Sequence, residues 1–349
     1  MKNKIIISVV LTILIVVGFA IFSKPIDNSP IKIGVILPLS GDLAFIGEPA
    51  KRGAEMALAN FKDTKHKYEL IFEDDQFDGK KAITAANKLI FMDKVSALVT
   101  FGSSGGNSVK PLAETNKILH FAVASDQNIA DGIYNFNHWT SPKEEVSAMV
   151  AEFARKNIKT ISILTMNQDG MVAIANELEN QLKNTAFKII VNEKFNVGTR
   201  DFRTLVAKVK TDLPDIIVLV NYSPELEILG KQIKEAGINI PMTSFEGLDA
   251  TTDPKIFTGS WYSTASDMTD IFRMNFQNKN NLAPVVGTGN VFDIITLIVT
   301  ATENTRGNPT GLNIGSELLK IKDLIGSMGS ISLDKTGSVI SKAVIKTIR

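Results

Sequence analysis

The chain of 349 residues has no cysteine and only three histidines. Without a thiol it can form no disulfide, no thiolate nucleophile, no cysteine-ligated metal site and no lipid-modified N-terminal cysteine. His66, His120 and His138 show no metal-ligand spacing, and His120 lies inside an apolar stretch that is typical of a structural histidine. We therefore expect no metal and no cofactor.

An excess of one charge is also missing. The sequence has 38 basic and 37 acidic side chains and no basic block, so it gives no electrostatic basis for binding nucleic acid. The glycines at 34, 41 and 47 do not match a dinucleotide fingerprint, and no Gly-Lys-Ser/Thr follows the glycine-rich stretch at 102–106. That stretch also lacks the GxSxG spacing of a nucleophile turn. These absences argue against an enzyme.

The start of the chain differs from the rest, whose composition is that of a globular protein. Lys2 and Lys4 precede an uncharged run at 5–22, the pattern of a secretory signal or of a membrane anchor. We expect residues 1–23 to be one of the two and 24–30 to be a linker. The protein is then exported, to the periplasm or to the outer face of the cytoplasmic membrane, with membrane contact through 5–22 if they are not cleaved.

From residue 31 onward, β-branched runs alternate with amphipathic stretches. Strands are predicted at Ile31–Leu37, Tyr68–Glu73, Ala97–Phe101, Ile118–Val123, Thr160–Thr165, Phe187–Asn192 and Asp215–Val220. Helices are predicted between and after them, at 47–60, 79–93, 108–116, 143–156, 170–184, 201–211, 223–236, 269–279 and 285–303. This alternation predicts an α/β fold with doubly wound parallel sheets. The tail from 329 onward is typical of a hairpin.

The rhythm pauses at 135–144, which we interpret as a crossing between two lobes. The length also favours two lobes, because one core stops growing below ~300 residues. We expect lobe 1 at 31–142 plus 269–330, and lobe 2 at 143–268 plus 331–349.

Ligands of doubly wound sheets bind where strands end and helices begin. The stretch VTFGSSGGNSVKP is such a junction, with Ser103 and Ser104 between an apolar strand and a helix. Free N–H groups at a helix N-terminus favour an anion such as a carboxylate. Simple capping of the helix by these serines is the alternative that the spacing leaves open.

Other junctions carry further candidates. Small residues precede an acid at Ala124-Ser125-Asp126, where backbone groups can approach a ligand closely or Asp126 can cap the next turn. Tyr222 follows a strand and can pack on an aliphatic chain while it donates through its hydroxyl. Glu246 lies in a short apolar loop, and a buried carboxylate needs a partner. That partner is a ligand ammonium or an internal Lys or Arg. The pair His138-Trp139 is a weaker candidate for lining a cleft.

In their order and spacing, these segments resemble the leucine/isoleucine/valine-binding family, the branched-chain amino-acid group of type I periplasmic binding proteins. The segments are IKIGVILPLSGDLAFIGEPAKRGAEMA, YELIFEDDQFDGKKAITAANKLI, VTFGSSGGNSVKPLAE, ILHFAVAS, NYSPELEILGKQIKEAGINIP, FEGL and GSISLDKTG. The resemblance implies a type I periplasmic binding protein fold, with two lobes joined by three crossing segments and a ligand in the cleft between them.

The resemblance also implies roles for single residues. Ser103 matches the serine that bonds the ligand carboxylate, and Ala124 matches the small residue whose backbone binds the polar end of the ligand. Tyr222 matches a ligand contact, and Glu246 the partner of the ligand ammonium.

Three positions depart from the family pattern. Asp126 stands where Thr or Ser is common, and Asp169 where a Tyr-Gly often begins the first helix of the second lobe. The family usually has an aromatic residue just before the glycine of the first loop. This chain has Ile46 at that position and Phe45 one position earlier. The two extra carboxylates predict a ligand with an amine or amide group beyond, or instead of, a plain aliphatic side chain.

The sequence therefore predicts an extracytoplasmic solute-binding protein of an ABC-type importer that captures an amino acid or a related small amine or amide by lobe closure. The resemblance implies ABC permease and ATPase subunits as partners. The alternative is a membrane-anchored receptor that senses the same ligand without a role in transport. The ligand itself is not fixed by the sequence.

Overall fold

A computed structural model describes residues 29–349, and Ile31–Arg349 form one compact unit. The predicted signal or anchor at 1–23, and residues 24–28 of the predicted linker, lie outside the described residues. No described helix is both long enough and apolar enough to cross a membrane.

The first sheet has five parallel strands in the order β2-β1-β3-β4-β5. The strands are β1 (Ile31–Leu37), β2 (Tyr68–Asp74), β3 (Ala97–Phe101), β4 (Leu119–Val123) and β5 (Asn135–Asn137). Strands β3 and β4 are buried along their whole length, as expected for the centre of a parallel sheet with helices on both faces.

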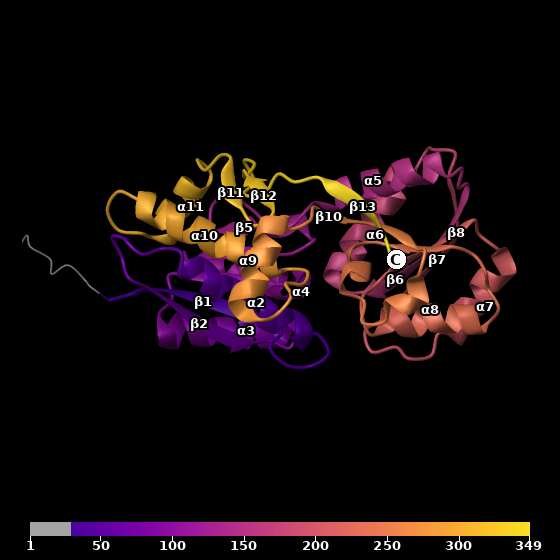
Figure 1. The fold of residues 1–349 in the computed structure, drawn as a ribbon, viewed down its shortest axis with the longest axis horizontal. Coiled ribbons are helices and arrows are strands. Elements are labelled where there is room, and N and C mark those ends of the chain that lie inside the picture. Colours follow the sequence, from indigo (N-terminus) through magenta and orange to yellow (C-terminus); the bar gives the residue numbers. More distant parts are fainter. Residues whose placement is uncertain (1–28) are drawn as a thin grey trace, which may run out of the picture. The chain divides into compact units, whose positions relative to one another are not determined.

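Helices from both ends of the described chain cover this sheet. They are α2 (Ala44–Leu58), α3 (Gly79–Lys88), α4 (Ser103–Asn116), α9 (Asp270–Asn280), α10 (Thr288–Asn304) and α11 (Gly311–Leu318). Figure 1 shows α10 and α11 on the same lobe as β1–β4, and they pack against β3 and β4 although more than 150 residues separate them in the sequence. Buried residues of α10, among them Ile294 and Ile298, share one core with Ile33 and Val35 of β1.

The second sheet has six strands in the order β13-β10-β9-β8-β6-β7. They are β6 (Thr160–Asn167), β7 (Lys188–Asn196), β8 (Ile216–Val220), β9 (Met242–Ser244), β10 (Trp261–Ala265) and β13 (Ala343–Thr347). All neighbours are parallel except β10 and β13. Its helices are α5 (Pro142–Arg155), α6 (Asp169–Leu182), α7 (Arg203–Asp212) and α8 (Glu225–Glu235).

The predicted strands and helices recur with shifts of a few residues, except at α4. This helix starts at Ser103 rather than at 108, because Gly102 adopts φ +87° and turns the chain directly into the helix. The glycine-rich stretch is therefore the first turn of the helix and not a loop before it.

The tail does not form the predicted hairpin as a whole. Strand β12 (Gly329–Ile331) pairs with β11 (Leu324–Gly326), and a short turn brings Leu333 opposite Val339. The chain then leaves for the second sheet, where β13 pairs antiparallel with β10. Each half of the tail finds its hydrogen-bond partners in a different lobe.

Three segments connect the two sheets, at 138–141, 266–269 and 340–342. The predicted boundary between the lobes lay earlier, after residue 330, with residues 331–349 assigned to lobe 2. However, Ile331 and Leu333 are buried in the core of the first sheet. We propose that lobe 1 extends to residue 339.

Candidate ligand-binding site

A cavity of about 80 Å³ lies where strands of both sheets end. Ser103 follows β3, Ala124 follows β4, Tyr222 follows β8 and Glu246 follows β9, so the cavity is built at the carboxyl ends of four parallel strands. Much of its wall is apolar and comes from Leu43, Ile46, Phe101, Met171 and Val286. Its volume suits a small molecule, since one water needs roughly 10–15 Å³ on this scale.

Five of the nine predicted site residues line this cavity, namely Ser103, Ala124, Ser125, Tyr222 and Glu246. They come from four separate junctions and from both lobes. The cavity therefore brings together residues that are up to 143 positions apart in the sequence.

The other four predicted residues lie outside this cavity. Ser104 and Asp169 line a neighbouring, outer cavity of about 390 Å³. Phe45 lines neither one, because α2 begins at Ala44 and turns Leu43 and Ile46 inward while Phe45 is 38% exposed.

Asp126 is occupied by hydrogen bonds of its own chain. Its backbone N–H donates to Ser103 Oγ at 3.1 Å, and its carboxylate accepts from the Asn128 backbone at 3.0 Å. The Asn107 amide donates to both Asp126 and Asp169, each at 3.0 Å, and thus links the two lobes. Neither carboxylate lines the inner cavity, so the basis for predicting an additional cationic group on the ligand is missing.

Ser103 is well placed to hold an anion. It is the first residue of α4, and the first turn of a helix leaves backbone N–H groups without intrahelical acceptors. Since Ser103 Oγ accepts a hydrogen bond from Asp126 N, its own hydrogen is left to be donated to a ligand. The positive end of the helix dipole adds to the attraction for a carboxylate.

Glu246 supplies negative charge to the cavity from the second lobe. Its Oε1 accepts from Ser125 Oγ at 2.6 Å, and its Oε2 accepts from Trp139 Nε1 at 2.6 Å. Burial raises the pKa of Glu246 to about 7; the two hydrogen bonds oppose this shift, and the nearby Asp249 adds to it. Among the described residues no Lys, Arg or His forms an ion pair with Glu246, so the internal partner that the sequence left open is not found.

Trp139 was only a weak candidate in the sequence, yet it is central here. It lies on the crossing segment 138–141 and both lines the cavity and fixes Glu246. Its neighbour His138 instead receives a hydrogen bond from Asn290 and lies 3.5 Å from Asp293, away from the cavity. The alternating directions of an extended segment send these two adjacent side chains to different places.

Phe77 and Gln168 are cavity residues for which the sequence gave no role in binding. Phe77 packs edge-on against Tyr222, with ring centroids 5.4 Å apart. Gln168 caps α6 by accepting from the N–H groups of Gly170 and Met171, and its amide donates to Ser104 Oγ across the lobes at 3.3 Å. Each residue precedes a helix start by one or two positions, which is the signal that could have marked them.

The structural interpretation of His120 is confirmed. Its two ring nitrogens form 2.8 Å hydrogen bonds with Thr100 and Asn135 inside the first sheet, and burial lowers its pKa to about 4. Within residues 29–349 no group of three or more His, Asp or Glu side chains is arranged to hold a metal ion.

Comparison with known proteins decides the family. Residues 30–346 match the sequence profile described as periplasmic binding protein. The chain belongs to the periplasmic binding protein family. The resemblance to its branched-chain amino-acid group, first read from the sequence, is confirmed by relatives that bear that name. Members of this family are solute-binding proteins and not enzymes, and membership implies an extracytoplasmic location.

Relatives in this family cover nearly the whole chain. The Leu/Ile/Val-binding protein BraC3 of Rhizobium johnstonii is 23% identical over 91% of each chain. The leucine-binding protein LivK of Thermotoga maritima superposes with a TM-score of 0.84 at 22% identity, covering 91% of this periplasmic binding protein and 95% of LivK. LivJ of Streptococcus pneumoniae, solved with isoleucine, gives 0.82 at 22% identity over 92% and 97% of the two chains. These superpositions establish the type I fold with two lobes.

Proposed function

We propose that this periplasmic binding protein captures an α-amino acid with an aliphatic side chain between its lobes. Ser103 and the first turn of α4 hold the carboxylate, and Glu246 holds the ammonium group. The two groups come from different lobes and line the same small cavity, which supports this arrangement. The single observation that carries it is the Glu246 carboxylate in the cavity wall, which accepts two hydrogen bonds from neutral donors and has no basic partner among the described residues.

The apolar walls supply the selectivity for the side chain. Val286, Ile46 and Phe101 of lobe 1 and Met171 of lobe 2 surround the remaining space. Each methylene that leaves water against such walls contributes about 0.8 kcal/mol. The names of the relatives, which mention leucine, isoleucine and valine, agree with a ligand of this size.

The remaining head-group contacts are proposed on the same basis. The backbone of Ala124 approaches the polar end of the ligand, and Ser125 orients Glu246. Tyr222 contacts the ligand with its ring. Trp139, which the structure adds to this set, holds the second oxygen of Glu246.

The protein then delivers the amino acid to the permease and ATPase subunits of an ABC importer. Contacts between the lobes, such as the one between Ser125 and Glu246, form only when the cleft is closed, so a permease that prefers the closed state reads occupancy as a population shift. We further propose that residues 5–22 direct export, and sequencing of the mature N-terminus distinguishes a cleaved signal from an anchor.

A thermal-shift screen of the purified full chain tests the binding function. The panel contains amino acids, their amides, polyamines and small carboxylates. An aliphatic amino acid at ~100 times its dissociation constant stabilises the fold by roughly 2.7 kcal/mol. If a polyamine stabilises the protein in this screen and no amino acid does, the proposal is overturned. Uptake by a strain that lacks the gene then separates transport from sensing, because an importer component is required for uptake and a sensor is not.

A further inference from the structure

The loop between β2 and α3 carries an aromatic ring into the cleft on a strained backbone. Gln76 and Phe77 both adopt positive φ, at 50° and 61°, although neither is glycine. The Asp74 carboxylate accepts from Gln76 N at 3.0 Å, and the buried Asp75 carboxylate accepts from Phe77 N at 2.9 Å. Two carboxylates thus hold a conformation that non-glycine residues rarely adopt and that concentrates at ligand clamps.

The ring of Phe77 is seated as specifically as its backbone. A Cβ atom at Gly102 would lie 2.4 Å from Phe77 Cε2, so the ring occupies space that only glycine leaves open. On its other side the ring meets Tyr222 of lobe 2 edge-on at 5.4 Å. Phe77 therefore fills the gap between the residue before Ser103 and the opposite lobe.

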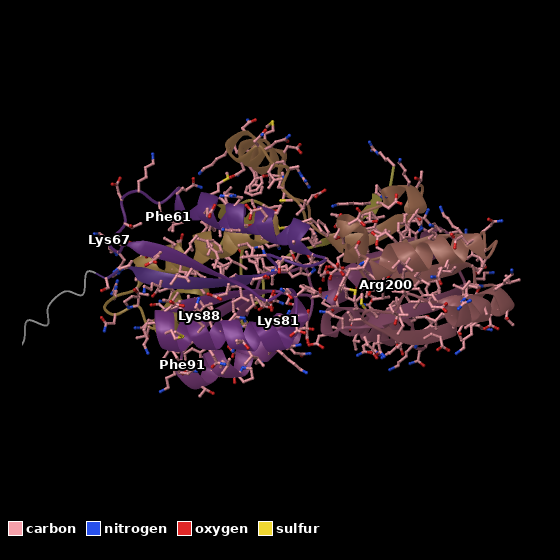
Figure 2. The ribbon with its side chains drawn as sticks, turned by 90° about the horizontal axis from the view of Figure 1, so that it is seen from below. Phe61, Lys67, Lys81, Lys88, Phe91 and Arg200 are labelled. Carbon is pink, nitrogen blue, oxygen red and sulfur yellow. The ribbon has the colours of Figure 1, made fainter. Side chains whose placement is uncertain are left out.

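This ring pair lies between two cavities, together with Leu43 and Gln168. Phe77 and Tyr222 line the inner cavity of about 80 Å³ and also the outer cavity of about 390 Å³. The outer cavity carries charged residues, among them Asp42, Asp169 and Arg200, the last of which Figure 2 labels on the second lobe. The side chains of Phe77 and Tyr222 thus lie between the small apolar space and a larger space that carries charged groups.

We propose that Phe77 sets the length of the ligand side chain. Its ring packs against Tyr222 and limits the inner cavity to short aliphatic amino acids. Longer side chains are blocked from extending into the outer cavity. This inference rests on the proposed function, because it assumes that the inner cavity holds an amino acid. Removing the ring joins the two cavities, so that phenylalanine and arginine gain room for their side chains, and the guanidinium of arginine gains the carboxylates of the outer cavity.

Calorimetry on the full chain and its Phe77→Ala and Phe77→Leu variants tests this role. The probes are valine, leucine, phenylalanine and arginine. Phe91→Ala is the matched control, since Phe91 is 52% exposed and Figure 2 places it on the first lobe, away from the second. We expect wild type and the control to bind valine and leucine only. Phe77→Ala binds phenylalanine or arginine at least about tenfold more tightly than wild type, and Phe77→Leu gains less.

Two results overturn the inference in distinguishable ways. If Phe77→Ala unfolds cooperatively and keeps the wild-type ligand profile, Phe77 does not set ligand length while the proposed function stands. If Phe77→Ala does not fold, the ligand profile of Phe77→Leu is compared with that of wild type instead, and an unchanged profile overturns the inference. If wild type binds none of the four amino acids, the proposed function fails and the inference fails with it.

Discussion

Ser125 of the first lobe donates a 2.6 Å hydrogen bond to Oε1 of Glu246 in the second lobe. The carboxylate that we assign to the ligand ammonium is thus oriented by the opposite lobe as well as by Trp139 on the crossing segment. Binding and closure share this residue, so variants at the site affect both.

Glu246→Gln keeps the shape of the side chain and removes its charge. An ammonium group then loses its carboxylate partner, and affinity for amino acids falls by about 3–5 kcal/mol, beyond detection in most titrations. Glu235→Gln, at an exposed position of α8, is the control and keeps wild-type affinity. Unchanged binding by Glu246→Gln contradicts the assigned role.

Ser103→Ala removes the hydroxyl from the start of α4. A hydrogen bond to a charged carboxylate contributes about 1.5–3 kcal/mol, so calorimetry is expected to show roughly 10-fold to 150-fold weaker binding. Ser104→Ala is the matched variant one residue away, and its effect is expected to be smaller because Ser104 lines the outer cavity. Equal losses in the two variants would point to a general effect on the helix instead of a ligand contact.

Ligand affinity depends on pH through Glu246. Burial raises its pKa to about 7, and an ammonium ligand binds only the ionised form, so binding near pH 6 releases a proton. Affinity therefore falls as the pH drops below 7, and the loss approaches roughly 100-fold at pH 5. Titrations in buffers with different ionisation enthalpies count the protons. A flat profile between pH 5 and 8 is incompatible with this account.

Glu145 of α5 lowers the stability of the fold at neutral pH. Its carboxyl group is fully buried without a hydrogen-bond partner, and burial raises its pKa well above the usual range, with the charges of Glu246 and Asp249 adding to the shift. Because the folded pKa is raised, the folded state binds more protons than the unfolded state once the pH exceeds about 4.3. Stability therefore decreases as the pH rises from there toward the folded pKa.

Glu145→Gln removes this penalty. Denaturation by urea at pH 7.5 is expected to show a gain of about 1–3 kcal/mol over wild type, and a smaller difference at pH 4.5. Glu144→Gln changes the exposed neighbour on the same helix turn and shifts stability by no more than about 0.5 kcal/mol. A loss of stability at pH 7.5 would show that Glu145 is ionised and paired.

Much of the fold follows from local sequence. Strands such as Ile31–Leu37 and Ala97–Phe101 are largely apolar runs, and the structure places them as predicted. Short strands such as β9 were missed, because three residues carry too little periodicity to show a pattern. The path of β13 was missed because its antiparallel partner, β10, is more than 75 residues away.

The residues of the candidate site likewise divide into those that local sequence predicts and those that depend on distant partners. Ser103, Ala124, Tyr222 and Glu246 each follow a strand directly, and a strand end at the cleft fixes their position. Phe77 reaches the cavity only because two carboxylates hold a positive-φ turn and Gly102 leaves room for its ring. Asp126 and Asp169 lie outside the inner cavity, and both accept from one distant amide, that of Asn107. Such tertiary partners leave no local pattern.

The most direct test of the central claim compares leucine with two analogues that each lack one half of the head group. Leucinamide has no carboxylate for Ser103 and the α4 N-terminus, and 4-methylpentanoate has no ammonium for Glu246. Calorimetry on the full chain is expected to show binding of leucine, and loss of at least about 100-fold in affinity for each analogue. Binding of either analogue as tightly as leucine, or no binding of leucine, isoleucine or valine, would contradict the account.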